Sequence, residues 1–164
     1  MPARPPAVTK AQYETLAELR YALRRFLAFS EEVAQAAGLT PQQHQALLAI
    51  KGFPGRDRIT IGELAERLQI RHHSTVELAD RLVDLGFTRR VRSTEDRRRV
   101  YLALTARGES VLERLSAAHR EQLRRIGPQV NQLLEHLRGD RSNARAARTV
   151  DTQRDQAPKP RRSV

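Results

Sequence analysis

Cysteine and tryptophan are absent from this 164-residue chain, and its other aromatic residues are few. Without cysteine the protein has no disulfide bond, no catalytic thiolate and no thiol-based redox sensor. Phenylalanine and tyrosine make up only 4% of the residues, so the core must be built mainly from leucine, alanine, valine and isoleucine. Hydrophobic residues reach only 39%, which suggests that part of the chain is solvated or packs against a partner subunit.

Long apolar segments are also missing. No run of about 18 apolar residues occurs, so the sequence predicts no transmembrane helix. The N-terminal segment MPARPPAVTK lacks the apolar region of a signal peptide. We therefore expect a cytoplasmic protein that does not enter a membrane.

Motifs of catalysis and metal binding are absent as well. The chain has no GxSxG elbow, no Walker loop and no dinucleotide-binding glycine fingerprint. Its five histidines form no HxxxH or HExxH pair, although a metal site that joins His44 and His119 across two elements remains open. For His44 we prefer the simpler interpretation of a partly buried polar residue. The sequence thus predicts a protein that is not an enzyme and has no cofactor.

Positive charge is what the sequence has in excess. Lysine and arginine number 30 against 19 aspartates and glutamates, giving a formal net charge of +11 and a pI near 11.3. Such a balance indicates a polyanionic partner, usually nucleic acid or an anionic membrane. Solubility alone is the alternative explanation, and the placement of the charge along the chain decides between them.

The chain begins with an arm and a long helix. Residues 1–8 are rich in proline and predict a flexible arm. Apolar residues then recur at three- and four-residue steps over 9–37, which predicts a helix that ends at Gly38. Tyr21 and Phe29 lie off the main apolar stripe. They either serve a second surface, such as a subunit interface or a pocket wall, or widen the same buried face.

A helix-turn-helix is predicted next. Thr40 with Gln43 forms a capping box for a first helix, and Thr60 with Glu63 forms another for the helix that follows. Gln69 and Ile70 make a turn, and a second helix of the motif spans 72–85. Its buried face contains Leu78 and Leu82, and its outward residues are His72, His73, Val76, Glu77 and Arg81. Such a ridge fits the major groove of B-DNA.

A β hairpin follows the helix-turn-helix. Residues 87–92 and 100–104 alternate as strands, and the segment STEDRRR joins them. The tip presents Arg97, Arg98 and Arg99 and resembles a wing that lies on the phosphate backbone or enters a minor groove. The DNA-binding lobe would then span 40–105.

The C-terminal part is predicted to be helical and then disordered. Apolar residues at helical spacing cover 106–138, and Gly127-Pro128 is expected to break or bend this helix. After Gly139 the apolar pattern stops. Residues 139–164 are polar and basic, which predicts a disordered tail that adds nonspecific phosphate contacts.

The order of these elements resembles the MarR family of bacterial winged-helix transcriptional regulators. The resemblance covers roughly residues 12–137. Its sharpest part is Asp96-x-Arg98 followed by VYLALTARG, supported by GELAERL, DRLVDLGFTRR and LTPQQHQALLAI. The fold class it implies is mainly α with a small β wing, in which long N- and C-terminal helices dimerise.

The resemblance also implies partners and residue roles. The helices at 9–37 and 106–138 would interlock in a homodimer that binds a pseudo-palindromic operator. Asp96 would pair with Arg98 and hold it ready for the minor groove. A small ligand, often an aromatic or phenolic anion, would lie between the dimerisation helices and the DNA-binding lobe. Four residues are expected to line that pocket: Tyr21, Phe29, His44 and Leu48.

One position departs from the family pattern. A small capping residue usually precedes the recognition helix, and this chain has Arg71 there. The next two residues are His72 and His73, which are expected to be neutral unless phosphates are near, because a positive charge opposes the helix dipole at its N-terminus. Composition excludes a cysteine-based peroxide sensor and a tryptophan-dependent ligand site.

These observations predict a homodimeric transcriptional regulator, expected to be a repressor whose operator binding is tuned by a small ligand. The residues expected to contact DNA are His72, His73, Val76, Glu77, Arg81, Arg97, Arg98 and Arg99. Two alternatives stay open. One is a nonspecific architectural DNA-binding protein, and the other is a winged-helix module that binds proteins, against which the arginine-rich wing argues.

Overall fold

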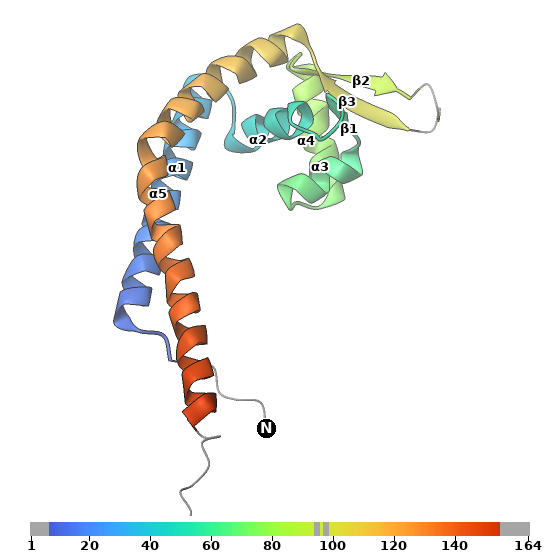
Figure 1. Cartoon of the computed structure of the whole chain (residues 1–164). Helices are drawn as coiled ribbons and strands as arrows, with labels where there is room; N and C mark the ends of the chain where they lie inside the picture. The colour runs from blue at the N-terminus through green and yellow to red at the C-terminus, as the bar shows by residue number, and fades with distance from the viewer. Residues whose placement is uncertain (1–6, 94–95, 97–98, 155–164) are drawn as a thin grey trace, which may run out of the picture. The chain divides into compact units, whose positions relative to one another are not determined.

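The computed structural model describes residues 7–93, 96 and 99–154, with residues 139–154 described by their backbone alone. The chain divides into two compact units, residues 26–123 and residues 1–25 with 124–164. Eight elements follow one another along the chain (Figure 1): α1 (Lys10–Ala36), α2 (Pro41–Lys51), β1 (Arg58–Ile59), α3 (Ile61–Leu68), α4 (His72–Asp84), β2 (Thr88–Arg92), β3 (Val100–Leu104) and α5 (Ala106–Arg154). The predicted class, mainly α with a small β wing, is confirmed. No helix of the described part is long and apolar enough to cross a membrane.

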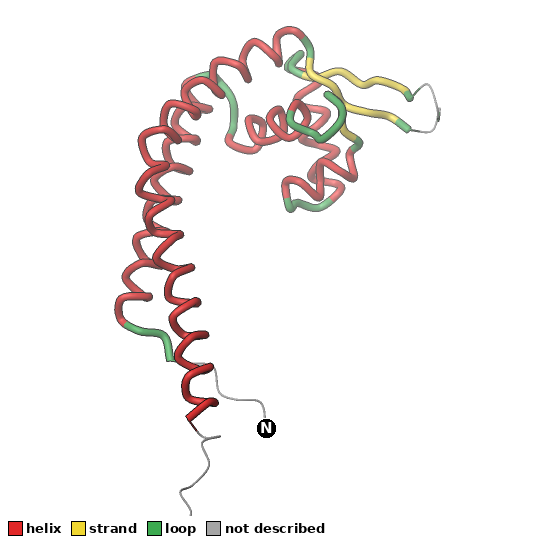
Figure 2. The backbone as a smooth tube through the Cα atoms, in the orientation of Figure 1, coloured by secondary structure: helices red, strands yellow, loops and turns green. Residues whose placement is uncertain are grey.

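The larger unit, residues 26–123, contains a three-stranded antiparallel sheet. The strand order is β1-β3-β2, and Figure 2 shows the β2–β3 hairpin with its tip in grey. Ile59 of β1 pairs with Leu102 of β3, and Arg90 of β2 pairs with the same residue from the other side. The sequence predicts β2 and β3 but not β1, because two residues are too few to show an alternating pattern.

The predicted helix starts and turns are confirmed. Thr40 Oγ1 accepts a hydrogen bond from the Gln43 amide at 3.2 Å, and Thr40 donates its own amide to Gln43 Oε1 at 2.9 Å. Thr60 and Glu63 form the same reciprocal box at the start of α3. Between α3 and α4 the chain reverses at Gln69, whose φ of 55° lies in the left-handed region. Each cap satisfies amides that a helix leaves without internal partners.

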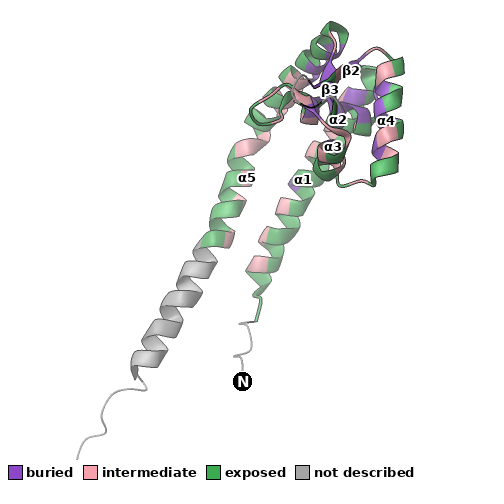
Figure 3. Cartoon of the chain, turned by 90° about the vertical axis from the view of Figure 1, so that its right-hand side faces the viewer, coloured by how far each residue is buried: buried purple, intermediate pink, exposed green. Residues whose placement is uncertain are grey.

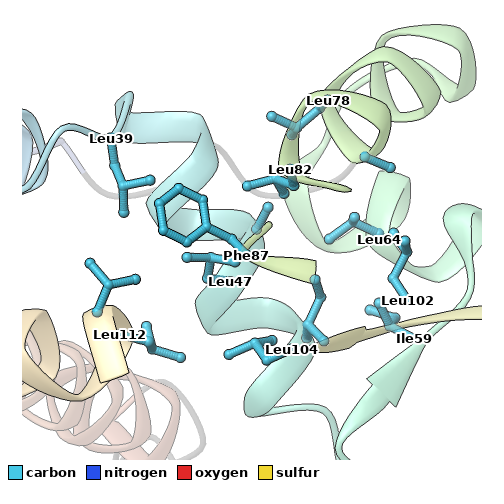
Figure 4. Close-up of a cluster of buried hydrophobic side chains, with 14 of the residues drawn as sticks. Leu39, Leu47, Ile59, Leu64, Leu78, Leu82, Phe87, Leu102, Leu104 and Leu112 are labelled. Atoms are coloured by element: carbon cyan, nitrogen blue, oxygen red, sulfur yellow. The ribbon is translucent and has the colours of Figure 1, made fainter. Parts of the chain in front are cut away.

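The core of this unit lies between α2, α3, α4, the sheet and the start of α5 (Figure 4). It is built from leucine, isoleucine and alanine, as the shortage of aromatic residues requires. The largest side chains that are almost completely buried are Leu47, Ile50, Ile59, Leu64, Leu82 and Leu102. Phe87 is the one aromatic residue of the described core cluster. Burial of each such side chain contributes roughly 1.5–3 kcal/mol, so this cluster fixes the positions of α3, α4 and the sheet.

The strand β3 is buried on both of its faces. Tyr101, Leu102, Ala103 and Leu104 are all buried, whereas Val100 is 40% exposed. Leu102 and Leu104 belong to the core cluster. On the opposite face, Tyr101 is covered by Arg56 from the loop before β1 and by Arg58 of β1. The alternating sequence pattern alone does not reveal this cover.

The C-terminal helix is longer and less interrupted than the sequence suggested. Of the break or bend expected at Gly127-Pro128, the break does not occur: helix α5 continues through both residues, because one proline removes only a single backbone donor. The helix also extends to Arg154, whereas a disordered tail was expected from residue 139. This segment is rich in alanine and arginine, which are strong helix formers even without an apolar stripe. The expectation for residues 155–164 lies outside the described residues.

Candidate nucleic-acid interface

Helix α4 has a buried face and an exposed face, as its sequence predicts (Figure 3). The buried face consists of Thr75, Leu78, Ala79 and Leu82, each at most 4% exposed. On the opposite face His72, His73, Glu77 and Arg81 are exposed, and Val76 is half-buried at its border. Packing of the first face against the core therefore presents five predicted DNA-contact residues together on one ridge.

The N-terminus of α4 is not capped by a side chain. Arg71 occupies the N-cap position with φ −69° and ψ 150°, and its side chain makes no capping hydrogen bond. Thr75 Oγ1 instead donates to the carbonyl oxygen of Arg71 at 3.0 Å. The first amides of α4 thus keep donors and a partial positive charge that suit an anion such as a phosphate.

Glu77 and Arg81 interact along the exposed face. The Arg81 guanidinium lies 3.6 Å from a carboxylate oxygen of Glu77, and its Nε donates to the Glu77 carbonyl oxygen at 3.2 Å. Of the two roles that the sequence left open for Glu77, the structure shows the ion pair. Both side chains are about two-thirds exposed, so the pair contributes little to stability and both groups stay accessible to a ligand.

A second ion pair joins α4 to the hairpin. The guanidinium of Arg90 on β2 forms a salt bridge with Asp80 on α4. Sequence reasoning missed this contact, because neither residue stands out in its own element and only the fold brings them together. The pair ties the base of the wing to the middle of the recognition helix.

Between β2 and β3, three described residues, Ser93, Asp96 and Arg99, are joined by hydrogen bonds. The Asp96 amide donates to Ser93 Oγ at 3.2 Å, and the Arg99 amide donates to the Asp96 carbonyl at 2.9 Å. Arg99 is exposed, and its Nε lies 3.7 Å from the Asp96 carboxylate. The predicted pairing of Asp96 with Arg98, and the positions of Arg97 and Arg98 themselves, lie outside the described residues.

Two of the four predicted ligand-pocket residues meet around a histidine of α5. The rings of Phe29 and His44 lie 5.7 Å and 4.7 Å from the ring of His119, measured between centroids. Phe26 contacts the same imidazole at 5.9 Å. Residues of α1, α2 and α5 thus meet at His119. The sequence alone indicates this residue only as a possible metal ligand together with His44.

The hydrogen bonds of His119 define its tautomer. Its Nδ1 lies 2.6 Å from the Leu115 carbonyl oxygen, which can only accept, so Nδ1 carries a proton. In the neutral ring Nε2 then accepts from the Ser30 hydroxyl at 2.8 Å. His44 is only 4% exposed. Burial, together with the neighbouring His119, lowers the pKa of His44 below its usual value.

The other two predicted pocket residues do not join this group. Leu48 is 50% exposed on α2, and Tyr21 is 51% exposed and contacts Arg25 of its own helix. A hollow of about 380 Å³ between α2 and α5 is lined by Lys51, Glu109, Leu112, Glu113 and Ser116, and by none of the four. Hydrogen bonds to Asp57 and Glu109 raise the pKa of Lys51 and keep it charged at the edge of this hollow.

The described residues contain no group of three or more histidine, aspartate or glutamate side chains arranged for a metal ion. His44 and His119 do approach each other, with their rings tilted by 36°, but both ring nitrogens of His119 already have hydrogen-bond partners. The geometry therefore favours an aromatic and hydrogen-bonding site over a metal centre.

Comparisons of the sequence agree with this arrangement. Residues 37–99 match the model of the MarR family. The HTH-type transcriptional repressor MdtR of Bacillus subtilis (strain 168) is 29% identical over 89 residues, which cover 54% of this chain and 56% of that protein. The match therefore spans only about half the length of this relative.

Solved structures show the same fold. A MarR family protein from Bacillus stearothermophilus aligns with a TM-score of 0.64 at 22% identity, over 84% of this chain and 99% of that one. NadR in complex with 4-hydroxyphenylacetate aligns with a TM-score of 0.61 at 22% identity, over 85% and 96%. The F27L mutant of S. aureus MepR, bound to an oligodeoxyribonucleotide, aligns with a TM-score of 0.57 at 18% identity, over 86% and 99%. The helix-turn-helix, the hairpin and the match over residues 37–99 agree, so this part of the chain is similar in sequence to the MarR family of winged-helix transcriptional regulators, and the fold is similar over most of the chain.

Proposed function

We propose that this protein is a homodimeric regulator that binds a specific double-stranded DNA operator and represses transcription. The observation that carries the proposal is the exposed ridge of α4, which the buried Thr75, Leu78 and Leu82 hold in place. The formal net charge of +11 supports a polyanionic partner. Repression is supported by the description of the Bacillus subtilis relative as a repressor, and similarity to the MarR family favours a regulator over an enzyme.

In this proposal α4 reads bases in the major groove. His72 and His73 donate to base acceptors or to phosphates, and Val76 contacts a thymine methyl group. Glu77 accepts from a cytosine amino group when the DNA displaces it from Arg81. The wing, with Arg97, Arg98 and Arg99, contacts the backbone or the adjacent minor groove, where arginine is favoured by the concentrated negative potential.

The dimer is supported by apolar side chains that the single chain leaves open on its long helices. These residues are Tyr13, Leu16, Tyr21, Leu23 and Leu27 on α1 and Leu123 and Leu134 on α5, each at least 39% exposed. A partner subunit would bury them. The two copies of α4 would then read half-sites about one DNA turn, roughly 34–36 Å, apart.

A small aromatic or phenolic acid is the proposed effector. The complex of NadR with 4-hydroxyphenylacetate supports this class, and the Phe26, Phe29, His44 and His119 group supplies aromatic surface with ring nitrogens. Such a ligand changes operator affinity only as far as it binds the DNA-free and DNA-bound conformations unequally.

Footprinting on the DNA upstream of the protein's own coding sequence tests the proposal. The wild type is expected to protect a two-fold symmetric site, and Val76→Ala combined with His73→Ala is expected to abolish protection while the dimer stays folded. Arg120→Ala, an exposed residue of α5, serves as the control and should keep the footprint. Unchanged protection by the α4 variant contradicts base reading by this helix.

The basic composition favours one second candidate, a nonspecific architectural DNA-binding protein. That protein would show a steep fall of affinity with salt and equal affinity for unrelated duplexes. Competition of a labelled upstream duplex by random DNA at about 150 mM salt separates the two, because specific binding survives an excess of random competitor.

A further inference from the structure

A cluster of arginines contains no residue of α4 or of the wing tip. Three guanidinium groups stack on two aromatic rings, and we name Arg56, Arg58, Arg67, Phe53 and Tyr101 the stacked-arginine cluster. Arg56 Cζ lies 4.5 Å from the ring centroid of Phe53 and 5.2 Å from that of Tyr101. Arg58 lies 4.8 Å from Tyr101, and Arg67 lies 5.2 Å from Phe53. The two rings thus join the three arginines into one continuous group.

The fold builds this cluster from three elements. Arg58 on β1 is paired with Ala103 on β3, and Tyr101 lies two residues along β3 on the same face of the sheet. On the other side of β3, Arg89 of β2 is paired with the same Ala103. Arg58, Ala103 and Arg89 therefore lie side by side across the three strands. Arg67 comes from the last turn of α3. The sheet face away from the core is therefore basic.

Only one of the three stacked arginines is neutralised by a carboxylate. Arg56 forms a salt bridge with Glu63, and its Nε donates to the Arg58 carbonyl oxygen at 2.9 Å. Burial opposes ionisation of Glu63, but hydrogen bonds from Thr60 and Arg56 outweigh it and lower the pKa of Glu63. In the described part of the chain no ion pair or side-chain hydrogen bond involves the guanidinium of Arg58 or Arg67. These two cations are available to an external anion.

The stacking suits phosphate groups. A guanidinium whose flat face rests on an aromatic ring keeps its N–H edge free and loses little further conformational freedom when it binds. Its fork of donors matches two oxygens of a phosphate. The rings themselves are covered, with Tyr101 6% exposed and Phe53 half-buried, so the surface offers charge rather than the open apolar area that the core of a protein interface requires.

The position along the chain points to the DNA backbone as the source of those phosphates. Arg67 lies in the last turn of α3, and the turn at Gln69 leads directly to His72 at the start of α4. In a helix-turn-helix the first helix crosses the sugar-phosphate backbone while the second enters the groove. We propose that the stacked-arginine cluster is a separate phosphate-binding surface, in which Arg58 and Arg67 hold the backbone of DNA that flanks the bases read by α4.

The choice of DNA as partner rests on the proposed function, so the experiment uses random-sequence duplex as well as upstream DNA. The variant is Arg58→Gln with Arg67→Gln, which removes two charges and keeps a polar side chain at each position. Arg24→Gln with Arg120→Gln removes two exposed charges elsewhere and is the control. Arg58→Lys with Arg67→Lys restores charge. Affinity is measured by fluorescence anisotropy from about 50 to 200 mM salt, and thermal unfolding verifies that each variant is folded.

Each lost phosphate contact lowers the slope of log affinity against log salt by about 0.9. We expect the glutamine variant to lose roughly 2 in slope per protomer on both duplexes, with the ratio of specific to random affinity unchanged. The lysine variant should keep most of the slope, and the control should resemble the wild type. On upstream DNA, the glutamine variant should lose more of the salt slope when the duplex extends beyond the footprint.

The outcomes separate the two proposals. A wild-type slope in the glutamine variant, or an equal loss in the control, overturns the phosphate surface whether or not the operator is confirmed. Loss of slope on random DNA without any preferred sequence upholds the surface and rejects the operator. Binding of polyglutamate that depends on Arg58 and Arg67, combined with unchanged DNA binding, overturns the surface in favour of an acidic protein partner. No affinity of the wild type for any duplex at low salt rejects both.

Discussion

The imidazole rings of His44 on α2 and His119 on α5 lie with their centroids 4.7 Å apart and are tilted by 36°, and His44 is almost completely buried. His119 is held by the Leu115 carbonyl and the Ser30 hydroxyl, so it cannot turn away without losing both hydrogen bonds. A charge on His44 would therefore lie in a poorly solvated position next to a second basic ring. The contact links α2 of the DNA-binding lobe to α5 at a position where a charge on His44 is disfavoured.

Stability is expected to fall in mild acid because of His44. Its folded-state pKa lies below the unfolded value of about 6.5, so the unfolded chain binds more protons and the stabilisation present above that pH is lost as the pH falls through the folded pKa. Each unit of lowering corresponds to about 1.4 kcal/mol. Urea unfolding at about pH 7.5 and about pH 5 should show a smaller loss for His44→Gln than for wild type. The exposed His136→Gln should behave like wild type, and an undiminished loss in His44→Gln rejects this assignment.

Gly108→Ala is expected to destabilise the larger unit by roughly 1–3 kcal/mol or more through overpacking. A Cβ at this position would lie 2.1 Å from the Phe87 carbonyl oxygen. That oxygen cannot shift freely, because it accepts hydrogen bonds from the amide and the hydroxyl of Thr105. Chemical denaturation measures the effect. Gly62→Ala, where a Cβ meets nothing within 4 Å, is the matched control and should leave stability unchanged or raise it.

Features encoded by neighbouring residues could be predicted from the sequence. The capping boxes at Thr40 and Thr60, the turn at Gln69 and the two faces of α4 all follow from spacings of a few residues. Helix periodicity is a local property, so the sequence predicts these elements and the exposed ridge of α4.

Features that depend on tertiary approach could not be predicted in this way. The Asp80–Arg90 salt bridge and the stacking of Arg58 on Tyr101 join residues from different elements, and no spacing along the chain marks them. Strand β1 has only two residues, too few for an alternating sequence pattern, and it forms by pairing with the edge of β3. The sequence allows a metal site between His44 and His119, but only the fold shows that both ring nitrogens of His119 are engaged by Leu115 and Ser30.

Leu23→Glu is expected to weaken the proposed dimer. Leu23 is 48% exposed on α1, and Leu16 and Leu27 repeat along the same helix with similar exposure. Burial of a leucine side chain is worth roughly 1.5–3 kcal/mol, and a carboxylate in its place adds a desolvation cost in each subunit. Sedimentation equilibrium should show at least a tenfold rise in the dimer dissociation constant. Arg24→Glu introduces the same group beside it, and an equal effect there would mean that Leu23 is not buried by a partner.

Arg71→Ser is expected to stabilise the protein while weakening its binding to DNA. The backbone at Arg71 already has the extended conformation of an N-cap, but its side chain makes no capping bond. Serine would accept from a free amide of the first turn and remove a cation that opposes the helix dipole, a gain of about 1 kcal/mol. The same change removes a positive charge beside His72, so the salt slope of DNA binding should decrease by about 1 per protomer if Arg71 meets a phosphate. Arg71→Ala separates the two effects, because it removes the charge without supplying a cap. Urea unfolding should place Arg71→Ser above Arg71→Ala in stability, while anisotropy titrations should find the two equally weakened on DNA. Equal stability of the two variants would show that the first turn of α4 gains nothing from a side-chain cap.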